Sequence, residues 1–195
     1  AENYLQKSLK IYETDVGSNV LMSKILLSKK DIIKAMQFAK RAVELDSRSI
    51  EGQISLGKAK SAFEGVKVAQ EYFKDLIHTY PSEMDYRLAL SEVLIQDEQF
   101  SAAKQILDQI TSYNFNIKEA HLLTGDVLFF QQKPEEALNS YFSAARIDPS
   151  DAGAIFRAGE IYLKLGRLTE AQKQFQLVEK INNLYPRAHL NLAKV

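Results

Sequence analysis

Histidines and adjacent carboxylates are the side chains of this sequence that could do chemistry. His78, His121 and His189 are potential metal ligands, and the neighbouring Glu135 and Glu136 could form a carboxylate pair for acid–base catalysis. The sequence has no cysteine, so it offers no thiolate nucleophile, disulfide framework or Cys-based zinc site. It also lacks a Gly-rich phosphate loop, a GxSxG turn and an HExxH motif. Any catalytic role therefore depends on whether the fold brings these few groups together.

A period of 34 residues organises the chain. The period divides the sequence into five windows without gaps: 16–49, 50–83, 84–117, 118–151 and 152–185. The eighth place of each window holds Gly or Ser, which lets two backbones cross closely. We expect the mostly large apolar residues that stand four places after each recurring alanine to fill the gap between neighbouring repeats. The alanines that define the period are Ala1, Ala35, Ala69, Ala103, Ala137 and Ala171.

Each window contains two apolar patterns of helical spacing. In the fifth window one pattern runs from Ile155 to Tyr162 and the other from Leu168 to Val178, with Gly166 as the break between them. The predicted unit is therefore a pair of antiparallel helices.

This arrangement separates the candidate catalytic groups. His121 and His189 share one window place but stand two repeats apart, about 20 Å at roughly 10 Å per repeat. They cannot share a metal, and we expect both to fill packing places. Glu135 and Glu136 are expected in the first turn of a helix, where acidic side chains favour the helix dipole. The sequence thus predicts no enzyme activity, no metal and no cofactor.

The period and its residues resemble the tetratricopeptide repeat (TPR) family over the whole chain. The fourth and fifth windows match that pattern best, with Gly125, Ala137 and Tyr141 in one and Gly159, Ala171 and Phe175 in the other. The resemblance implies an all-α fold, a right-handed α-solenoid of stacked antiparallel helix pairs.

The resemblance also predicts how the repeats are arranged along the chain. Residues 1–195 would form a single array, in which 1–15 are the second helix of a partial repeat and 186–195 the first helix of another. Because terminal repeats normally carry a polar outer face, we interpret the chain as a fragment of a longer array. The alternative is a natural end that is covered by self-association.

In this family the first helices line a concave groove, and the resemblance places a mostly apolar stripe there. Such stripes mark interaction sites for a peptide or a helix. Phe129 and Phe130 are the sharpest candidates, although both could instead pack helix against helix. The predicted partner-binding residues are Leu88, Glu92, Ile95, Leu122, Leu123, Asp126, Phe129, Phe130, Phe156, Glu160 and Leu163.

The charge pattern suggests the chemistry of a ligand. Overall charge is balanced, with 25 basic and 25 acidic residues, but the windows 84–117 and 118–151 each have a net charge of −3 (2 basic against 5 acidic, and 3 against 6). We expect a protein or peptide ligand with apolar and basic residues, steered by Glu92, Asp126 and Glu160. The alternative is a solvated acidic face without a ligand.

Two functions remain open at this point. One is a non-catalytic protein–protein interaction module that uses the groove. The other is a structural scaffold that assembles through the repeat ends or the convex face, by self-association or in a secretion or assembly complex. The acidic middle argues against nucleic acid, and no apolar run approaches the eighteen or so residues that would insert into a membrane. A soluble protein of either the cytoplasm or the periplasm fits.

Overall fold

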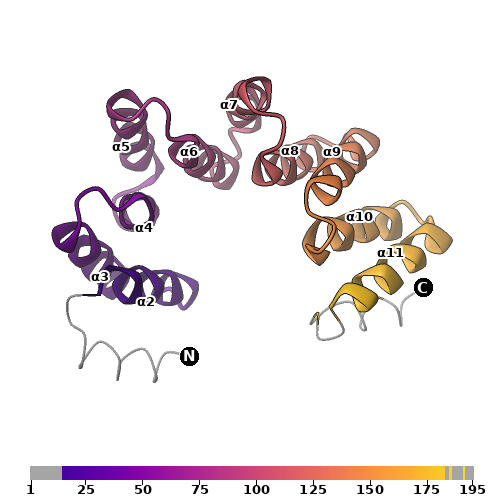
Figure 1. Ribbon diagram of the computed structural model, residues 1–195, viewed down its shortest axis with the longest axis horizontal. Helices are drawn as coiled ribbons and strands as arrows, with labels where there is room; N and C mark the ends of the chain where they lie inside the picture. Colours follow the sequence, from indigo (N-terminus) through magenta and orange to yellow (C-terminus); the bar gives the residue numbers. More distant parts are fainter. Residues whose placement is uncertain (1–14, 183–184, 186–190, 192–195) are drawn as a thin grey trace. The chain divides into compact units, whose positions relative to one another are not determined.

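The structure is a computed structural model that describes residues 15–182, 185 and 191. Helices connected by short loops make up the described chain, and none of its residues forms a strand, which confirms the predicted all-α fold (Figure 1). The contacts divide the chain into two compact units. The first, Ala1–Gln99, contains α2 (Val16–Ser28), α3 (Ile32–Leu45), α4 (Ile50–Phe63), α5 (Val66–Thr79) and α6 (Met84–Gln96). The second, Phe100–Val195, contains α7 (Phe100–Tyr113), α8 (Lys118–Phe130), α9 (Pro134–Ile147), α10 (Ala152–Lys164) and α11 (Leu168–Ile181).

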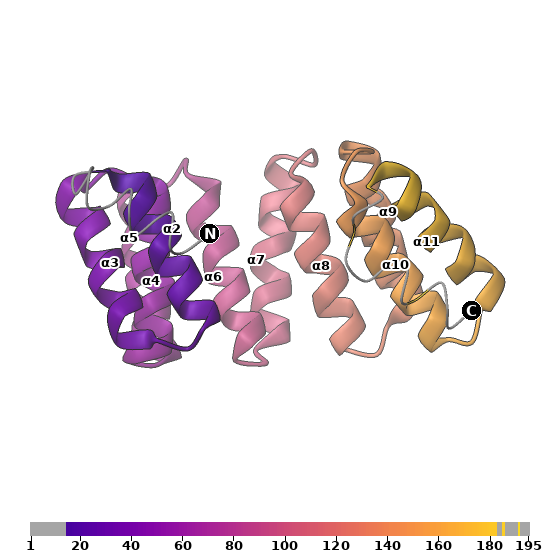
Figure 2. The same cartoon turned by 90° about the horizontal axis from the view of Figure 1, so that it is seen from below.

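The helices start at equivalent places of the 34-residue windows. First helices begin at residues 16, 50, 84, 118 and 152, and second helices at 32, 66, 100, 134 and 168. Figures 1 and 2 show the two helices of a hairpin, such as α8 and α9, lying side by side. The boundary between the units falls inside the window 84–117, between α6 and α7. The single array stays a prediction, and the partial repeats at 1–15 and 186–195 lie outside the described residues except for Asp15 and Asn191.

Side-chain caps start three of the first helices. The side chains of Asp15, Ser49 and Asp151 accept hydrogen bonds from the backbone N–H groups of Ser18, Gly52 and Gly153. All three capping residues occupy the place just before a window. Because the first backbone N–H groups of a helix have no partner inside it, a short polar side chain at this place fixes where the helix begins.

Glycines at the eighth place of three windows leave room for an aromatic ring of the second helix where the two helices cross. A Cβ atom on Gly57 would lie 2.7 Å from Cε2 of Phe73, and one on Gly159 would lie 2.7 Å from Cε1 of Phe175. These rings therefore pack first against the glycine of their own hairpin, whereas the sequence suggested that they fill the gap between repeats. They can do both, because Tyr141 packs in one buried cluster with Ala158 and Ile161 of the next hairpin. The recurring alanines from Ala35 to Ala171 are fully buried.

A left-handed residue ends most of the first helices. Lys30, Glu98, Gln132 and Gly166 occupy the fifteenth place of their windows and have φ values of 63°, 58°, 60° and 71°. In the second window a positive φ occurs one place later, at Gly65, with φ of 104° and ψ of 160°, because α4 extends to Phe63. Only glycine adopts this conformation without a steric cost.

Replacing Lys30 with glycine is therefore expected to stabilise the protein by about 0.5–1 kcal/mol, since it removes the cost of a left-handed side-chain-bearing residue. Gly166→Ala at the same window place should destabilise it by about 1 kcal/mol. Urea unfolding monitored by circular dichroism measures both changes. A change in the free energy of unfolding with the same sign in both variants would contradict the left-handed conformation assigned to Lys30 and Gly166.

Candidate functional site

The predicted groove residues lie on three first helices. Leu88, Glu92 and Ile95 are half-buried on α6 in the first unit. In the second unit, α8 carries Leu122, Leu123, Asp126, Phe129 and Phe130, and α10 carries Phe156, Glu160 and Leu163.

A cavity of about 660 Å³ opens beside α8 and α10, and we call it the α8–α10 groove. Its volume lies within the range of about 300–1,000 Å³ that is usual for ligand sites. Three of the eight predicted residues of this unit are absent from its lining; of these, Leu122 and Leu163 pack against buried clusters of the hairpins. The groove is lined by Asp126, Phe129, Phe130, Tyr141, Phe156, Arg157, Glu160, Ile161, Lys164 and Tyr185.

Two neighbouring phenylalanines form one wall of the groove. Phe130 is 56% exposed, and its ring stacks on Phe100 with centroids 5.3 Å apart. Phe129 is half-buried, and the Lys164 ammonium lies 4.2 Å from the centroid of its ring. This wall therefore combines an open aromatic face with a cation–π contact.

Phe156 lies deeper than a freely exposed groove residue. Its side chain is 4% exposed and packs against the rings of Phe175 and Tyr185, at centroid distances of 5.6 and 4.9 Å. It therefore serves the core of the last hairpin and contributes only a small surface to the groove.

Asp126 is the centre of a polar network in the groove. The Tyr141 hydroxyl donates a hydrogen bond of 2.6 Å to its carboxylate, and Arg157 forms an ion pair with the same group from α10. Burial, followed by the charge of Asp126, raises the pKa of the Tyr141 hydroxyl well above its usual value. This carboxylate is thus already satisfied within the chain.

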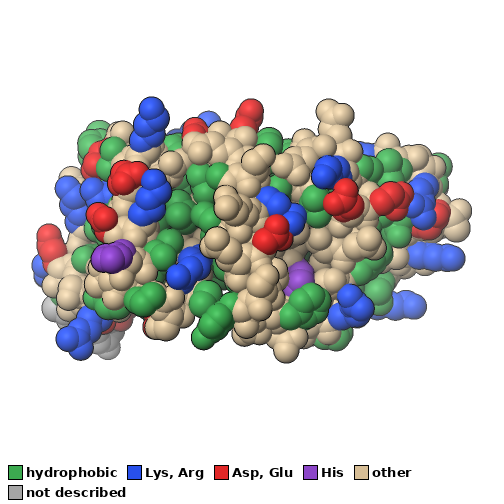
Figure 3. Space-filling model, turned by 90° about the horizontal axis from the view of Figure 1, so that it is seen from above, with side chains coloured by type: hydrophobic (Ala, Val, Ile, Leu, Met, Phe, Trp, Pro, Cys, Tyr) green, Lys and Arg blue, Asp and Glu red, His purple; other side chains and the backbone are tan. Residues whose placement is uncertain are grey.

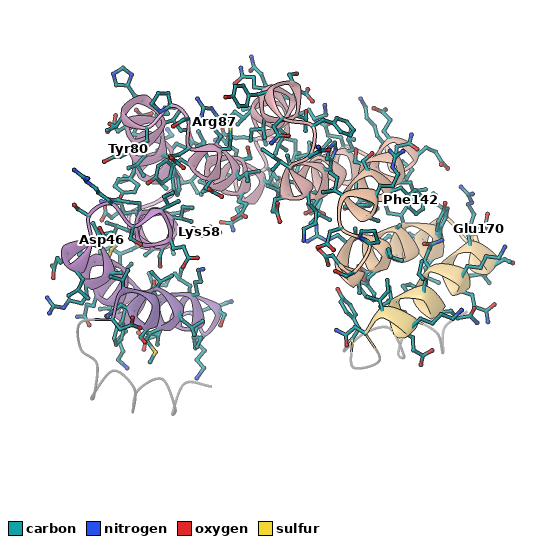
Figure 4. The ribbon with its side chains drawn as sticks, viewed as in Figure 1. Asp46, Lys58, Tyr80, Arg87, Phe142 and Glu170 are labelled. Atoms are coloured by element: carbon teal, nitrogen blue, oxygen red, sulfur yellow. The ribbon has the colours of Figure 1, made fainter. Side chains whose placement is uncertain are left out.

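The acidic side chains expected to steer a basic ligand have partners of their own. In the first unit, Glu92 forms an ion pair with Lys58 of α4. Lys58 is labelled in Figure 4. In the second, Asp126 is paired with Arg157, and Glu160 also interacts within the chain. The predicted groove residues therefore carry less uncompensated negative charge than the sequence indicated, because Lys58 and Arg157 lie outside the two acidic windows and compensate Glu92 and Asp126.

Five of the lining residues were not among the predicted partner-binding residues. Tyr141 was interpreted as a packing residue, and its hydroxyl nevertheless reaches Asp126. Arg157 and Lys164 face the groove from α10, and Ile161 and Tyr185 complete its apolar lining. The signal for Arg157 and Lys164 was their place in the window, because the sixth and thirteenth places face the concave side in the family that the sequence resembles.

His121, Glu135 and Glu136 have structural roles, and His78 is exposed on α5. The ring of His121 is 7% exposed, and its Nε2 atom lies 2.7 Å from the carbonyl oxygen of Phe115. Glu135 and Glu136 lie in the first turn of α9, where Glu135 pairs with Arg167. Within the described part of the chain, no three His, Cys, Asp or Glu side chains are grouped to hold a metal ion. His189 lies outside the described residues.

Charges of both signs are mixed on the surface. On the face shown in Figure 3, basic and acidic side chains are intermingled. Across the residues that the structure describes, no helix has the length and apolar character to cross a membrane.

Buried tyrosines make the free energy of unfolding decrease at alkaline pH. Burial raises the pKa of Tyr72 to about 12, and it also raises the pKa of Tyr86 and Tyr141. Unfolded tyrosine titrates near about 10, so above that pH the unfolded chain releases protons that the folded chain keeps. The stabilisation that these tyrosines give is complete below about pH 10 and is lost as the pH rises towards 12.

We therefore expect the Tm to fall between about pH 10 and 12, and to fall less steeply in Tyr72→Phe. Thermal melts followed by circular dichroism from pH 8 upwards provide the test. Comparing slopes removes the pH-independent effect of the hydrogen bond from Tyr72 to Gln53. Parallel curves for the two proteins would contradict this assignment of the titrating group.

Comparisons with known proteins place these features in context. Models described as tetratricopeptide repeat match residues 16–49, 88–152 and 128–195, which together cover more than half of the chain. The Homo sapiens protein named tetratricopeptide repeat protein 21A is 41% identical over 61 residues, which are 31% of this chain and 5% of that relative. The matched part of the chain is thus a small fraction of that protein's length.

Solved structures share the fold. TTC0263, a thermophilic TPR protein of Thermus thermophilus, superposes with a TM-score of 0.75 at 19% identity, over 92% of this chain and 98% of its own. YrrB, described as a TPR protein with an unusual peptide-binding site, gives a TM-score of 0.60 at 23% identity over 100% of both chains. These likenesses concern the fold alone, and they confirm the predicted helical-repeat solenoid.

Proposed function

Because the chain belongs to the tetratricopeptide repeat family, we propose that it is a non-catalytic protein-interaction module that binds a segment of a partner protein in the α8–α10 groove. The observation that carries this proposal is the cavity of about 660 Å³ with the exposed Phe130 at its wall. An aromatic side chain left open beside a cavity offers apolar area that a partner's side chains can cover.

The apolar part of the expected ligand has the stronger support. Phe129, Phe130 and Ile161 supply apolar lining from two helices. The expectation of a basic ligand depended on Glu92, Asp126 and Glu160, and the first two are neutralised by Lys58 and Arg157. The peptide-binding site in the name of YrrB supports a peptide as the kind of ligand.

Loss of a captured partner on truncation of the aromatic wall tests the proposal. The wild-type chain and the Phe129→Ala/Phe130→Ala variant are used as baits in lysate of the source cell, after circular dichroism has shown equal helicity and melting. Leu168→Ala/Leu177→Ala is the matched control, because both leucines are exposed on α11 outside the groove. A partner that the groove variant loses and the control keeps is then reduced to a synthetic segment. That segment should bind wild type in a fluorescence titration and bind the groove variant at least about tenfold more weakly.

A scaffold function is the second candidate, and one observation favours it. Tyr113 and Phe115, at the junction of α7 and α8, are 78% and 58% exposed. Tyr113→Ser/Phe115→Ser would remove partners or self-association in the scaffold case, while the groove variant would leave them unchanged. Self-association through the repeat ends concerns residues outside the described part of the chain.

A further inference from the structure

Asp126 and Tyr141 together build a site for a cation. The carboxylate of Asp126 is fixed by the Tyr141 hydroxyl at 2.6 Å, and the Tyr141 ring lies beside it. A carboxylate next to an aromatic face is a recurring arrangement for holding guanidinium or ammonium groups. The sequence predicted Asp126 as one of the acidic residues that attract a basic ligand, without the contribution of Tyr141.

The chain itself fills this site. Arg157 extends from α10, forms an ion pair with Asp126 on α8, and holds its guanidinium carbon 6.0 Å from the centroid of the Tyr141 ring. Asp126 is only 23% exposed and Arg157 41%. Because Arg157 is tethered next to the site, its effective concentration there is on the order of millimolar or higher. A lysine or arginine of a partner would have to displace it.

Lys164 is a second basic side chain that lines the groove. It lines both the α8–α10 groove and a neighbouring cavity of about 270 Å³ formed with Gln132, Pro134 and Leu165. Its ammonium lies over Phe129, and within the described part of the chain it forms no ion pair. Glu160 lines only the larger of the two cavities and already interacts within the chain.

We infer that Arg157 sets the charge preference of the groove: by occupying the cation site of Asp126 and Tyr141, it leaves Lys164 to meet a bound segment and favours partners with apolar and acidic side chains. This inference rests on the proposed function, and it replaces the expected basic ligand with an acidic one. The apolar side chains would enter beside Phe129 and Phe130, and a carboxylate would meet Lys164 next to the smaller cavity.

A pair of designed peptides tests the inference. The two fluorescein-labelled twelve-residue peptides share the same leucines and phenylalanines, and their charged positions are all Glu in one and all Lys in the other. At low salt, wild type should bind the Glu peptide about fivefold more tightly, and high salt should reduce this ratio. Lys164→Gln should bring the ratio close to one, and this exposed substitution is not expected to unfold the chain.

The reciprocal variant should cancel the preference. Arg157→Gln vacates the cation site, so the Lys peptide should gain about fivefold or more in affinity, whereas Arg157→Lys keeps the site filled and should gain little. Phe129→Ala/Phe130→Ala should weaken binding of both peptides and serves as the control for the groove.

The outcomes separate this inference from the proposed function. Equal binding of both peptides by wild type, or tighter binding of the Lys peptide, overturns the inference. The proposed function still stands in that case if Phe129→Ala/Phe130→Ala weakens peptide binding. No groove-dependent binding of either peptide overturns both. A Glu preference that both Lys164→Gln and Arg157→Gln abolish, and that Arg157→Lys keeps, supports the inference.

Discussion

Replacing Gly57 with serine is expected to destabilise the first unit by about 3 kcal/mol. The new Cβ atom would lie 2.7 and 2.8 Å from Cε2 and Cε1 of Phe73, and that ring is fully buried, so it has little room to move. Gly17→Ser is the matched control within the same unit. A Cβ atom there meets only Asp15 Oδ2 at 3.8 Å, and we expect a change within about 0.5 kcal/mol.

A second substitution should rescue the first. Phe73→Leu alone is expected to cost about 1–2 kcal/mol through the cavity that it leaves. Combined with Gly57→Ser it recreates the pair that the sequence has at the same two places of the third window, Ser91 and Leu107. Urea unfolding of the four proteins should give a favourable coupling free energy of about 2 kcal/mol, and strict additivity would show that the ring and the glycine do not compete for the same space.

Removing the Asp126 carboxylate is the second large expected effect. Asp126→Ala should cost about 2 kcal/mol, because it leaves the Arg157 guanidinium and the Tyr141 hydroxyl without the acceptor that both now use. Tyr141→Phe, which removes one hydrogen bond and keeps the ion pair, should cost about 1 kcal/mol.

A surface ion pair provides the control for this prediction. Asp108 pairs with Lys104 at 2.6 Å, but its side chain is 56% exposed, so Asp108→Ala should change the free energy of unfolding by less than about 0.5 kcal/mol. Chemical denaturation measures all three variants. Similar losses for Asp126→Ala and Asp108→Ala would mean that the network in the groove is as weak as a solvated pair.

The sequence was sufficient to predict the helices and their period. Each helix depends on apolar spacing and on turns within a few residues, and the crossing glycines Gly57, Gly125 and Gly159 recur at one place of the window. The ends of three helices are exceptions to this agreement. Lys30, Glu98 and Gln132 adopt a left-handed conformation after these helices, at a place where a glycine would have indicated it in the sequence.

The candidate site was predictable only in part, because its chemistry depends on contacts between helices. Asp126, Phe129 and Phe130 were placed by their window positions, and the structure shows them lining one cavity. The neutralisation of Asp126 requires Arg157, thirty-one residues further along the chain. Phe156 is buried because Phe175 and Tyr185 cover it, and a count of helical turns contains no information on such partners.

The matching of glycine with an aromatic ring has a consequence for how such a chain can be recombined. Gly57 with Phe73, Gly125 with Tyr141 and Gly159 with Phe175 each join the first and second helix of one hairpin, and the first window has the smaller pair of Ser23 and Ala39 in the same places. Exchanging a single helix between the first window and one of these three would bring serine against a ring or leave a glycine facing alanine. Between windows with different pairs, the smallest piece that can be exchanged without a mismatch at the crossing is therefore a whole hairpin, with breakpoints that fall between windows.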